Sequence, residues 1–284
     1  HLDRKLETLI NGLFLILLFL TPLLVSIKSS EVFELPKIHF VYALTAIIAG
    51  LWLARMVVCQ KIILRRTPLD LPILLFLLSQ IISTALSIHP QTSWFGYYGR
   101  FHGGLLSTIS YTLLYYAFVS NQSTRSTTST KGSRHTKNLY SSSGSSDSPN
   151  TSNSSGAFLL AIAASAAIVS LYAILQHFGI DKTIWVQDVQ NRVFSTLGQP
   201  NWLAAYLVMV IPPVWALMLT ARHRFSGSSD HSFIRLFGHS SHFNWSIGLL
   251  VHLSICLLSL LWTRSRSGLL GLAVADAVFW GLVF

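Results

Sequence analysis

Four arginines in this sequence each lie in a short polar segment next to a long apolar stretch. They are Arg100, Arg192, Arg264 and Arg266. A guanidinium group can form two parallel hydrogen bonds to one phosphate, so several guanidinium groups together suit a diphosphate. If the apolar stretches pack into a bundle, the three polar segments that carry these arginines can converge at one end of it. The pattern therefore indicates binding of a diphosphate-bearing molecule.

Arg192 and Arg266 lie in the two most distinctive of these segments. Arg192 opens the sequence RVFSTLGQPN. In it, Gly198 and Pro200 indicate a turn, and Asn201 can cap the helix that follows. Arg266 lies in TRSRSG, where almost no loop separates two apolar stretches. A charge at membrane depth costs about 2.5–3.5 kcal/mol on insertion scales, so it is retained where it pairs or functions. We favour a function over simple snorkelling for Arg266, whereas Arg192 could bind a lipid headgroup or a substrate phosphate.

The segment that contains Arg100 is rich in aromatic residues. It reads QTSWFGYYGRFHG at 91–103, and its three glycines break it into turns. An interfacial aromatic belt is the simple interpretation, because Trp and Tyr favour the headgroup zone. Five aromatic rings within eight residues exceed what such a belt needs, and ring faces can stack on sugars. We therefore expect a ligand-facing role for Trp94, Tyr97 and Tyr98.

Carboxylates on the same side of the predicted bundle offer a structural alternative for the arginines. They are Glu31, Glu34, Asp181 and Asp188. Each could form an ion pair with an arginine and remove it from ligand binding. Two further ionisable residues, His252 and Asp276, lie inside apolar stretches. We expect them to be buried hydrogen-bonding residues rather than catalysts.

The composition indicates which elements position these residues. Of the 284 residues, 51% are apolar and 11% are charged, whereas a soluble domain carries about 25% charged residues. Eight stretches approach the roughly 20 apolar residues that cross a bilayer as a helix. They are 9–27, 38–58, 69–88, 104–119, 157–178, 202–221, 245–262 and 267–284. We therefore expect an all-α, polytopic transmembrane helix bundle with about eight spans and the lipid bilayer as its solvent.

The basic residues predict the orientation of this bundle. Lys and Arg total 20 against 10 Asp and Glu. In a soluble protein this excess would suggest a nucleic-acid partner, but in a membrane protein cytoplasmic loop charge explains it. Alternate loops are richer in Lys and Arg, and the first strongly basic one includes Arg55, Arg65 and Arg66. We therefore expect a cytoplasmic N-terminus and no nucleic-acid partner.

The rest of the chain carries little chemistry. Residues 120–156 are rich in Ser and Thr, with Leu139 and Tyr140 as their only large apolar side chains. This composition predicts a disordered cytoplasmic loop within a membrane domain that occupies 1–284. We interpret Cys59 and Cys256 as packing residues. Because the histidines lack metal-ligand spacing, we expect neither a metal nor a cofactor. Because the sequence ends within an apolar run, we expect the membrane domain to be truncated at its C-terminus.

Two motifs in this chain are similar to those of a known family. RVFSTLGQPNWLAAYL at 192–207, followed by TRSRSGLLGL at 263–272, resembles the O-antigen ligase and Wzy-type polymerase family of bacterial membrane glycosyltransferases. FELPK at 33–37 and WFGYYGRFHG at 94–103 also resemble its longer members. The resemblance implies a GT-C-like, metal-independent enzyme of the bacterial cytoplasmic (inner) membrane. Such an enzyme transfers a glycan from an undecaprenyl-diphosphate carrier to an acceptor hydroxyl of lipid A-core or a growing polysaccharide, on the outer side.

The resemblance also implies roles for single residues. Arg192 and Arg266 match the family arginines that bind the carrier diphosphate, and they would stabilise the negative charge that builds on it as it departs. The family's proton acceptor is a His in an HN motif, which we expect beyond residue 284. Further substrate-binding residues are expected beside these arginines. They are Arg100, Arg264, Gln199 and Asn201, together with the three aromatic residues of segment 91–103.

Alternatives from other functional classes stay open. A transporter or flippase of lipid-linked sugars would also place cations near phosphates, although it needs charge along a cavity through the bilayer. A non-catalytic membrane scaffold would use the Ser-rich segment for interactions. Within the transferase interpretation, ligase and polymerase use the same donor and differ only in the acceptor.

Overall fold

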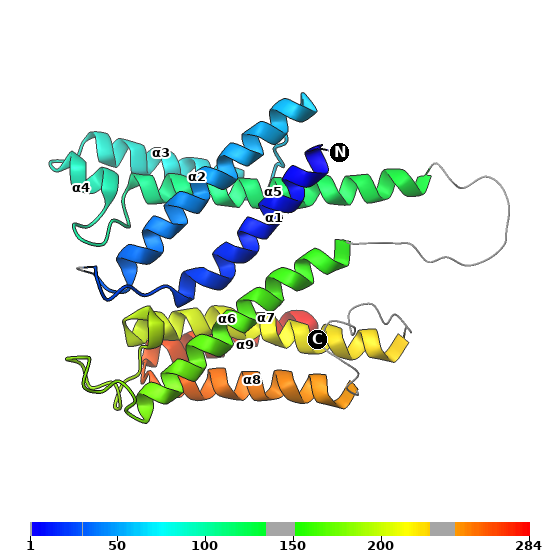
Figure 1. Ribbon diagram of the computed structural model, residues 1–284. Coiled ribbons are helices and arrows are strands. Elements are labelled where there is room, and N and C mark those ends of the chain that lie inside the picture. Colours follow the sequence, from blue (N-terminus) through cyan, green and yellow to red (C-terminus); the bar gives the residue numbers. More distant parts are fainter. Residues whose placement is uncertain (1, 30, 135–150, 228–241) are drawn as a thin grey trace. The chain divides into compact units, whose positions relative to one another are not determined.

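The computed structural model in Figure 1 describes the backbone of all residues except 1, 30, 135–150 and 228–241. Every regular element in this described part is helical, which confirms the predicted all-α class. The chain forms two compact units. Unit 1 comprises His1–Thr21 and Val25–Phe158, and unit 2 comprises Pro22–Leu24 and Leu159–Phe284.

Unit 1 is built around three long helices that pack against one another. Its helices are α1 (Leu2–Leu20), α2 (Glu34–Cys59), α3 (Asp70–Ala85), α4 (Pro90–Phe95) and α5 (Leu105–Arg134). Ile10 and Ile48 are fully buried where α1 meets α2. Phe118 of α5 closes this core, because its ring lies edge-on to Phe14 at 5.2 Å and to Phe158 at 5.2 Å between centroids.

Unit 2 is organised around one central helix. Its elements are α6 (Thr151–His177, entering from unit 1), the 3-10 turn η2 (Ser195–Leu197), α7 (Pro200–Gly227), α8 (His242–Trp262) and α9 (Arg266–Val283). α7 contacts both α8 and α9. Small residues such as Ala166 and Ala173 let α6 approach the same core, as is common where helices meet in a membrane.

The helices agree with the apolar stretches of the sequence, but fewer of them meet the requirements for a span. Each of the eight stretches coincides with a helix. Within the described part, five helical segments are long and apolar enough to cross a membrane: Leu2–Leu23, Glu34–Cys59, Gly156–His177, Pro200–Leu219 and Arg266–Val283. Asp70–Ala85 and Ile247–Trp262 are apolar but shorter. The length and composition of the five indicate a membrane protein, and the predicted total of eight stays a prediction.

The predicted orientation assumes that successive loops lie on alternate sides of the membrane. Contacts within unit 1 agree with this assumption. At one end, the Tyr42 hydroxyl donates a hydrogen bond of 2.8 Å to the carbonyl of Phe101, which joins the start of α2 to the segment after α4. At the other end, the N–H of Arg65 donates to the Ser120 hydroxyl at 3.1 Å. The loops expected to share a side therefore lie at the same end of this unit. Which end faces the cytoplasm stays a prediction.

Both ends of segment 120–156 are helical, whereas the sequence predicted disorder for the whole segment. α5 continues to Arg134, and α6 already begins at Thr151. Ser120 and Asn121 are buried within unit 1. Adding a residue to an existing helix costs much less than starting a new one, so Ser and Thr can extend a helix that packing has already formed. Residues 135–150 lie outside the described part, and the prediction stays untested there.

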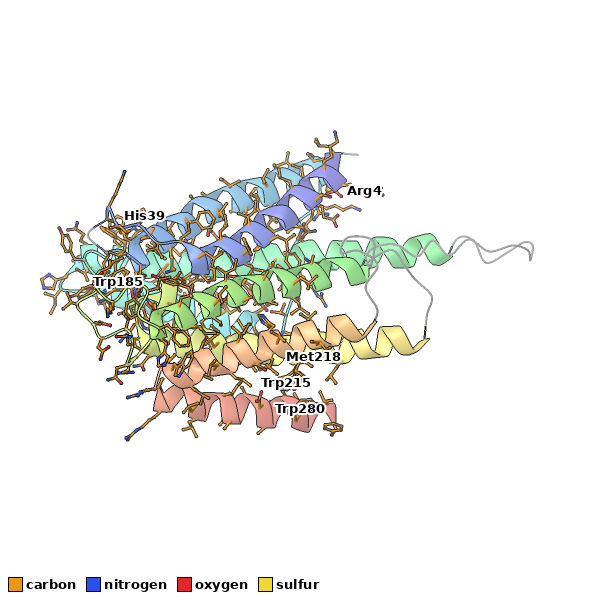
Figure 2. All side chains as sticks on the ribbon, turned by 60° about the horizontal axis from the view of Figure 1, so that its bottom comes forward. Arg4, His39, Trp185, Trp215, Met218 and Trp280 are labelled. Carbon is orange, nitrogen blue, oxygen red and sulfur yellow. The ribbon has the colours of Figure 1, made fainter. Side chains whose placement is uncertain are left out.

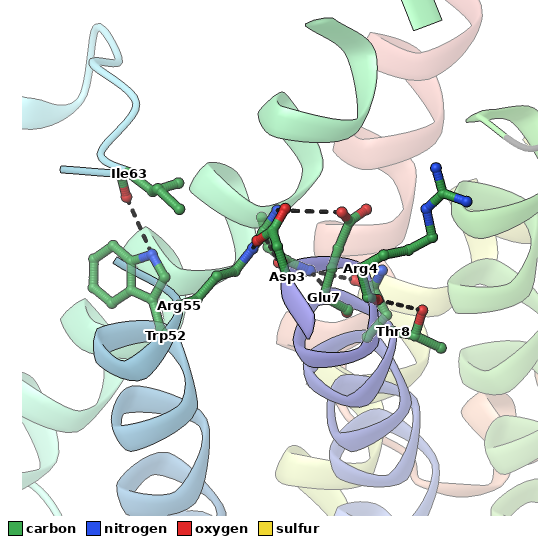
Figure 3. A network of polar contacts seen from close by, with 9 residues as sticks. Asp3, Arg4, Glu7, Thr8, Trp52, Arg55 and Ile63 are labelled. Carbon is green, nitrogen blue, oxygen red and sulfur yellow. Dashed lines mark hydrogen bonds and ion pairs between the residues drawn. The ribbon is translucent and has the colours of Figure 1, made fainter. Parts of the chain in front are cut away.

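A buried arginine joins the helices of unit 1 at the end that carries the N-terminus. Arg55, near the end of α2, has no solvent-exposed surface. Its guanidinium donates to the Asp3 carboxylate and to the Asn121 side-chain oxygen, and it lies 3.2 Å from the Glu7 carboxylate. Figure 3 shows this network, together with the bond from the Trp52 indole to the Ile63 carbonyl. The sequence interpretation of Arg55 as a loop cation is therefore wrong, because two carboxylates of α1 hold it inside the unit.

Close packing of α9 against α7 depends on a glycine. A Cβ atom added at Gly268 would lie 2.5 Å from the Cβ of Ala204, so one helix would have to move. We expect Gly268→Ala to lower the free energy of unfolding by about 1–3 kcal/mol, the usual cost of overpacking. Reversible unfolding in detergent micelles measures this change.

Gly271 provides the matched control on the same helix. A Cβ atom there would lie 3.7 Å from the nearest side-chain atom, which belongs to Val208, so Gly271→Ala should leave stability unchanged or raise it slightly. Combining Gly268→Ala with Ala204→Gly should restore most of the loss. Equal stability of the two single variants would contradict a close approach of α7 and α9 at residue 268.

Candidate functional site

Residues 178–199 fold back onto unit 2 around the buried side chain of Gln176. Its side-chain oxygen accepts hydrogen bonds from the N–H of Phe194 at 3.3 Å and of Ser195 at 2.7 Å. The Ser195 hydroxyl in turn donates to the Val169 carbonyl at 2.6 Å. Ser195 has a φ of 53°, a left-handed conformation that is uncommon for a non-glycine residue. These bonds hold the segment in one conformation directly before α7.

Asp181 is the second anchor of this segment. One of its carboxylate oxygens accepts hydrogen bonds from the Tyr172 hydroxyl at 2.6 Å, the Gln176 amide at 2.9 Å and the Trp185 indole at 2.6 Å. Trp185 is labelled in Figure 2. Burial raises the pKa of Asp181, but the hydrogen bonds outweigh burial, and the pKa lies below its ordinary value. Asp181 is thus bound by neutral donors, and no arginine of the described residues pairs with it.

Arg192 connects three elements of unit 2 at this end. Its Nε–H donates to the Thr263 carbonyl at 3.1 Å, and one terminal N–H donates to the Asn201 side-chain oxygen at 3.4 Å. The next N–H in the chain, that of Val193, donates to the Trp262 carbonyl at 3.3 Å. The Arg192 side chain is exposed. A guanidinium carries five N–H donors, so most of them stay available for a ligand after these two bonds form.

The turn between α8 and α9 presents two more arginines beside Arg192. Thr263 and Ser265 are buried in this turn, whereas Arg264 and Arg266 are exposed. The Ser265 hydroxyl caps α9 by accepting the N–H of Gly268 at 3.2 Å. Arg264 has a φ of 49°. The buried hydroxyl residues therefore fix the backbone, and the cationic side chains between them point away from the core.

The three arginines of unit 2 differ from Arg100 in their partners. Among the described residues, no carboxylate lies within ion-pair distance of Arg192, Arg264 or Arg266. Arg100, in unit 1, lies 3.1 Å from the Glu31 carboxylate and 3.3 Å from that of Glu34. Arg100 therefore follows the structural alternative, in which ion pairs with carboxylates remove an arginine from ligand binding. The structure brings together three of the four predicted arginines, and the fourth is occupied by carboxylates.

The aromatic segment lies at the same end of unit 1 as Glu31 and Glu34. Tyr97 and Tyr98 are 68% and 89% exposed, and Trp94 is 42% exposed. Gly96 is essential to the turn, because it has a φ of 94° and a Cβ atom there would overlap the His102 carbonyl oxygen. These rings are therefore available to a ligand or to the membrane interface.

Sequence reasoning missed one contact in this region and one organising residue in unit 2. The His102 imidazole lies 3.1 Å from the Glu34 carboxylate, which also faces Arg100. In unit 2, Gln176 organises the segment before α7. Gln176 could have been noticed as a polar residue within an apolar stretch. The contact between residues 34 and 102 depends on tertiary packing and could not have been predicted from spacing.

The other predicted polar residues have local roles. Asn201 binds Arg192, and the Gln199 carbonyl accepts the N–H of Leu203 at 3.0 Å at the start of α7. Within α8, the His252 imidazole lies 3.6 Å from the Cys256 sulfur. A carboxylate oxygen of Asp276 is buried and reaches hydrogen-bond geometry with no described residue. The nearby rings of Trp215 and Trp280, labelled in Figure 2, lie 5.3 Å apart.

No protein-family model, no curated protein and no solved structure matches this chain. Its function is therefore inferred from the residues and their geometry.

Proposed function

We propose that this protein is a glycosyltransferase that moves a glycan from an undecaprenyl-diphosphate carrier to an acceptor hydroxyl, like O-antigen ligases and polymerases. The observation that carries the proposal is the group formed by Arg192, Arg264 and Arg266 at one end of unit 2. These side chains are exposed, and no carboxylate of the described residues pairs with them. The motifs at 192–207 and 263–272, which resemble that family, lie in the same place.

A lipid-linked diphosphate has the two properties that this end of unit 2 requires. Its phosphates supply the negative charge that three neighbouring cations attract. Its isoprenoid chain can remain in the bilayer beside the apolar helices. A free sugar nucleotide would supply the charge but would gain nothing from apolar helices. The anchoring of Arg192 by Thr263 and Asn201 supports the proposal, because a positioned cation stabilises the departing diphosphate without first reorganising.

The remaining parts of the proposal concern the setting of the reaction. The site would face the outer side of the bacterial cytoplasmic membrane, with a cytoplasmic N-terminus, in a GT-C-like fold of about eight spans. The acceptor would be lipid A-core or a growing polysaccharide. Trp94, Tyr97 and Tyr98 would stack on sugar rings, and their exposure supports that role.

A transfer assay tests the proposal directly. The full-length protein is reconstituted in liposomes with an undecaprenyl-diphosphate-linked glycan and a glycan acceptor. We expect both the glycosylated acceptor and free undecaprenyl diphosphate to form, without added metal ions. Movement of the intact donor across the bilayer without cleavage would instead identify a flippase. If no product forms and the donor does not move, only the alternative of a non-catalytic membrane scaffold remains, and the proposal is contradicted.

Cysteine labelling tests the side of the membrane independently of activity. Val186 is fully exposed in the segment that carries Arg192, and Ile62 is 85% exposed in the loop expected on the opposite side. In a variant without Cys59 and Cys256, a membrane-impermeant maleimide should label Val186→Cys in intact spheroplasts. It should label Ile62→Cys only after lysis. The reverse pattern would place the arginines in the cytoplasm and contradict the proposed reaction.

A further inference from the structure

The segment that follows α2 carries three exposed cations at the end of a helix long enough to cross a membrane. That helix ends at Cys59. Residues 60–66, which we call the basic segment, read QKIILRR. Its three cations, Lys61, Arg65 and Arg66, are all exposed. A segment directly after a span lies at the depth of the lipid headgroups. These cations therefore lie where the phosphates of a bilayer would be.

Two hydrogen bonds hold the backbone of the basic segment in place. The Trp52 indole donates to the Ile63 carbonyl at 3.1 Å, as Figure 3 shows. The N–H of Arg65 donates to the Ser120 hydroxyl of α5 at 3.1 Å. Trp52 and Ser120 are both buried, so the two bonds tie the segment to the core of unit 1. The cations on either side of Ile63 are thus presented from a positioned backbone, which lowers the ordering cost of binding a ligand.

The carboxylates at this end of unit 1 are already bound by other residues. The two carboxylates of α1 hold Arg55. Asp70, at the start of α3, accepts hydrogen bonds from the Thr67 hydroxyl at 2.7 Å and the Tyr116 hydroxyl at 3.0 Å. Arg66 attracts Asp70 from a distance. Among the residues that the structure describes, no carboxylate lies within ion-pair distance of any cation of the basic segment. This surface therefore carries a positive charge that needs an anion.

Apolar side chains lie between and beside these cations. Ile62 is 85% exposed and Leu64 is 53% exposed. A hollow of about 330 Å³ lies where α2 meets the basic segment, and it is lined by Met56, Val57, Gln60, Lys61 and Ile62. This volume falls within the range of about 300–1,000 Å³ that is usual for small-molecule sites. Since exposed apolar surface is stabilised by leaving water, the region suits a ligand that has both an anionic group and hydrocarbon.

We propose that the basic segment and the end of α2 bind an anionic phospholipid, and this inference does not depend on the proposed transfer reaction. The phosphate lies against Lys61, Arg65 and Arg66. The first methylene groups of one acyl chain lie against Val57 and Ile62. A free phosphate ion would leave the apolar hollow in water, and a zwitterionic phospholipid would bring a cation of its own to a positive surface. A phospholipid with a net negative charge satisfies both features.

Titration of the full-length protein with lipid in detergent micelles tests this site. Native mass spectrometry counts the bound molecules of phosphatidylglycerol, which is anionic, and of phosphatidylcholine, which is zwitterionic. We expect phosphatidylglycerol to bind more tightly. Each cation near an anionic lipid surface contributes roughly fivefold in affinity, so Lys61→Gln combined with Arg66→Gln should weaken phosphatidylglycerol binding about 25-fold. The matched control is Arg4→Gln combined with Lys5→Gln, which removes the same charge from exposed positions of α1 at the same end and should leave binding nearly unchanged.

A second variant tests the apolar part of the site. Ile62→Ser keeps every charge and changes an exposed side chain, so it should fold normally and weaken phosphatidylglycerol binding about tenfold. Equal losses in the two double variants would mean that net charge alone attracts the lipid, and equal affinity for the two lipids would mean that charge is not read. Either result would overturn the inference. Unchanged binding by Ile62→Ser, or displacement of the lipid by an equimolar amount of inorganic phosphate or of an acidic peptide, would overturn the assignment to a lipid. Glycan transfer enters none of these measurements, so their failure leaves the proposed function untouched.

Discussion

Replacing Arg192 by alanine is expected to lower kcat for glycan transfer by about 100- to 1,000-fold, because removing one preorganised donor from a developing charge has this effect in other enzymes. The variant also loses the bonds to the Thr263 carbonyl and the Asn201 side chain. Arg192→Lys keeps the charge but cannot reproduce the two-pronged geometry, so we expect an intermediate rate. Steady-state transfer assays in liposomes, with donor binding measured separately, give both quantities.

Arg266→Ala should resemble Arg192→Ala, since it removes a second unpaired cation from the same group. Arg100→Ala is the matched comparison, because Arg100 lies within 3.1 Å of Glu31 and 3.3 Å of Glu34. Its loss should affect transfer much less than the loss of Arg192. Full turnover by Arg192→Ala and Arg266→Ala, with normal insertion into the membrane, would remove both residues from the reaction.

The helices could be predicted from the sequence because each one contains an apolar stretch long enough to define it. All eight stretches became helices. What the stretches could not define was where a helix ends in polar sequence. α5 continues through Ser and Thr to Arg134, because extending an existing helix outweighs the weak preference of those residues for helix. Hydropathy reports the apolar part of a helix, so the predicted helix boundaries were poorest at residues 120–134 and 151–156.

The candidate site could be predicted only in part, because motif residues are visible in sequence and their partners are not. The motifs around Arg192 and Arg266 indicated which arginines meet in unit 2. The pairing of Arg100 with Glu31 joins residues 69 positions apart. Such contacts arise from tertiary packing, which the spacing of residue types does not encode.

Arg55 shows the same limit of sequence analysis. A charged residue beside an apolar stretch looks like an ordinary loop cation even when it is buried. In the structure it is fully buried and joins α1, α2 and α5 (Figure 3). Asp3 and Glu7 lie one turn apart on α1, so one guanidinium can reach both. Two carboxylates around a single buried cation make this site depend strongly on that cation.

Arg55→Ala is therefore expected to lower the free energy of unfolding by about 3–5 kcal/mol, the usual cost of removing one partner from a buried ion pair. Most of this cost falls on Glu7, whose side chain is only 14% exposed, rather than on Asp3, which is 38% exposed and can reach water. Arg55→Ala combined with Glu7→Gln should thus recover part of the loss. Reversible unfolding in mixed detergent micelles measures the stabilities of the wild type, of Arg55→Ala and of the double variant.

Arg66, exposed in the next loop, provides the control, and Arg66→Ala should change stability by less than about 0.5 kcal/mol. If the two alanine variants were equally stable, the carboxylates of α1 would not depend on Arg55, and its burial would have to be explained by the packing of its methylene chain alone.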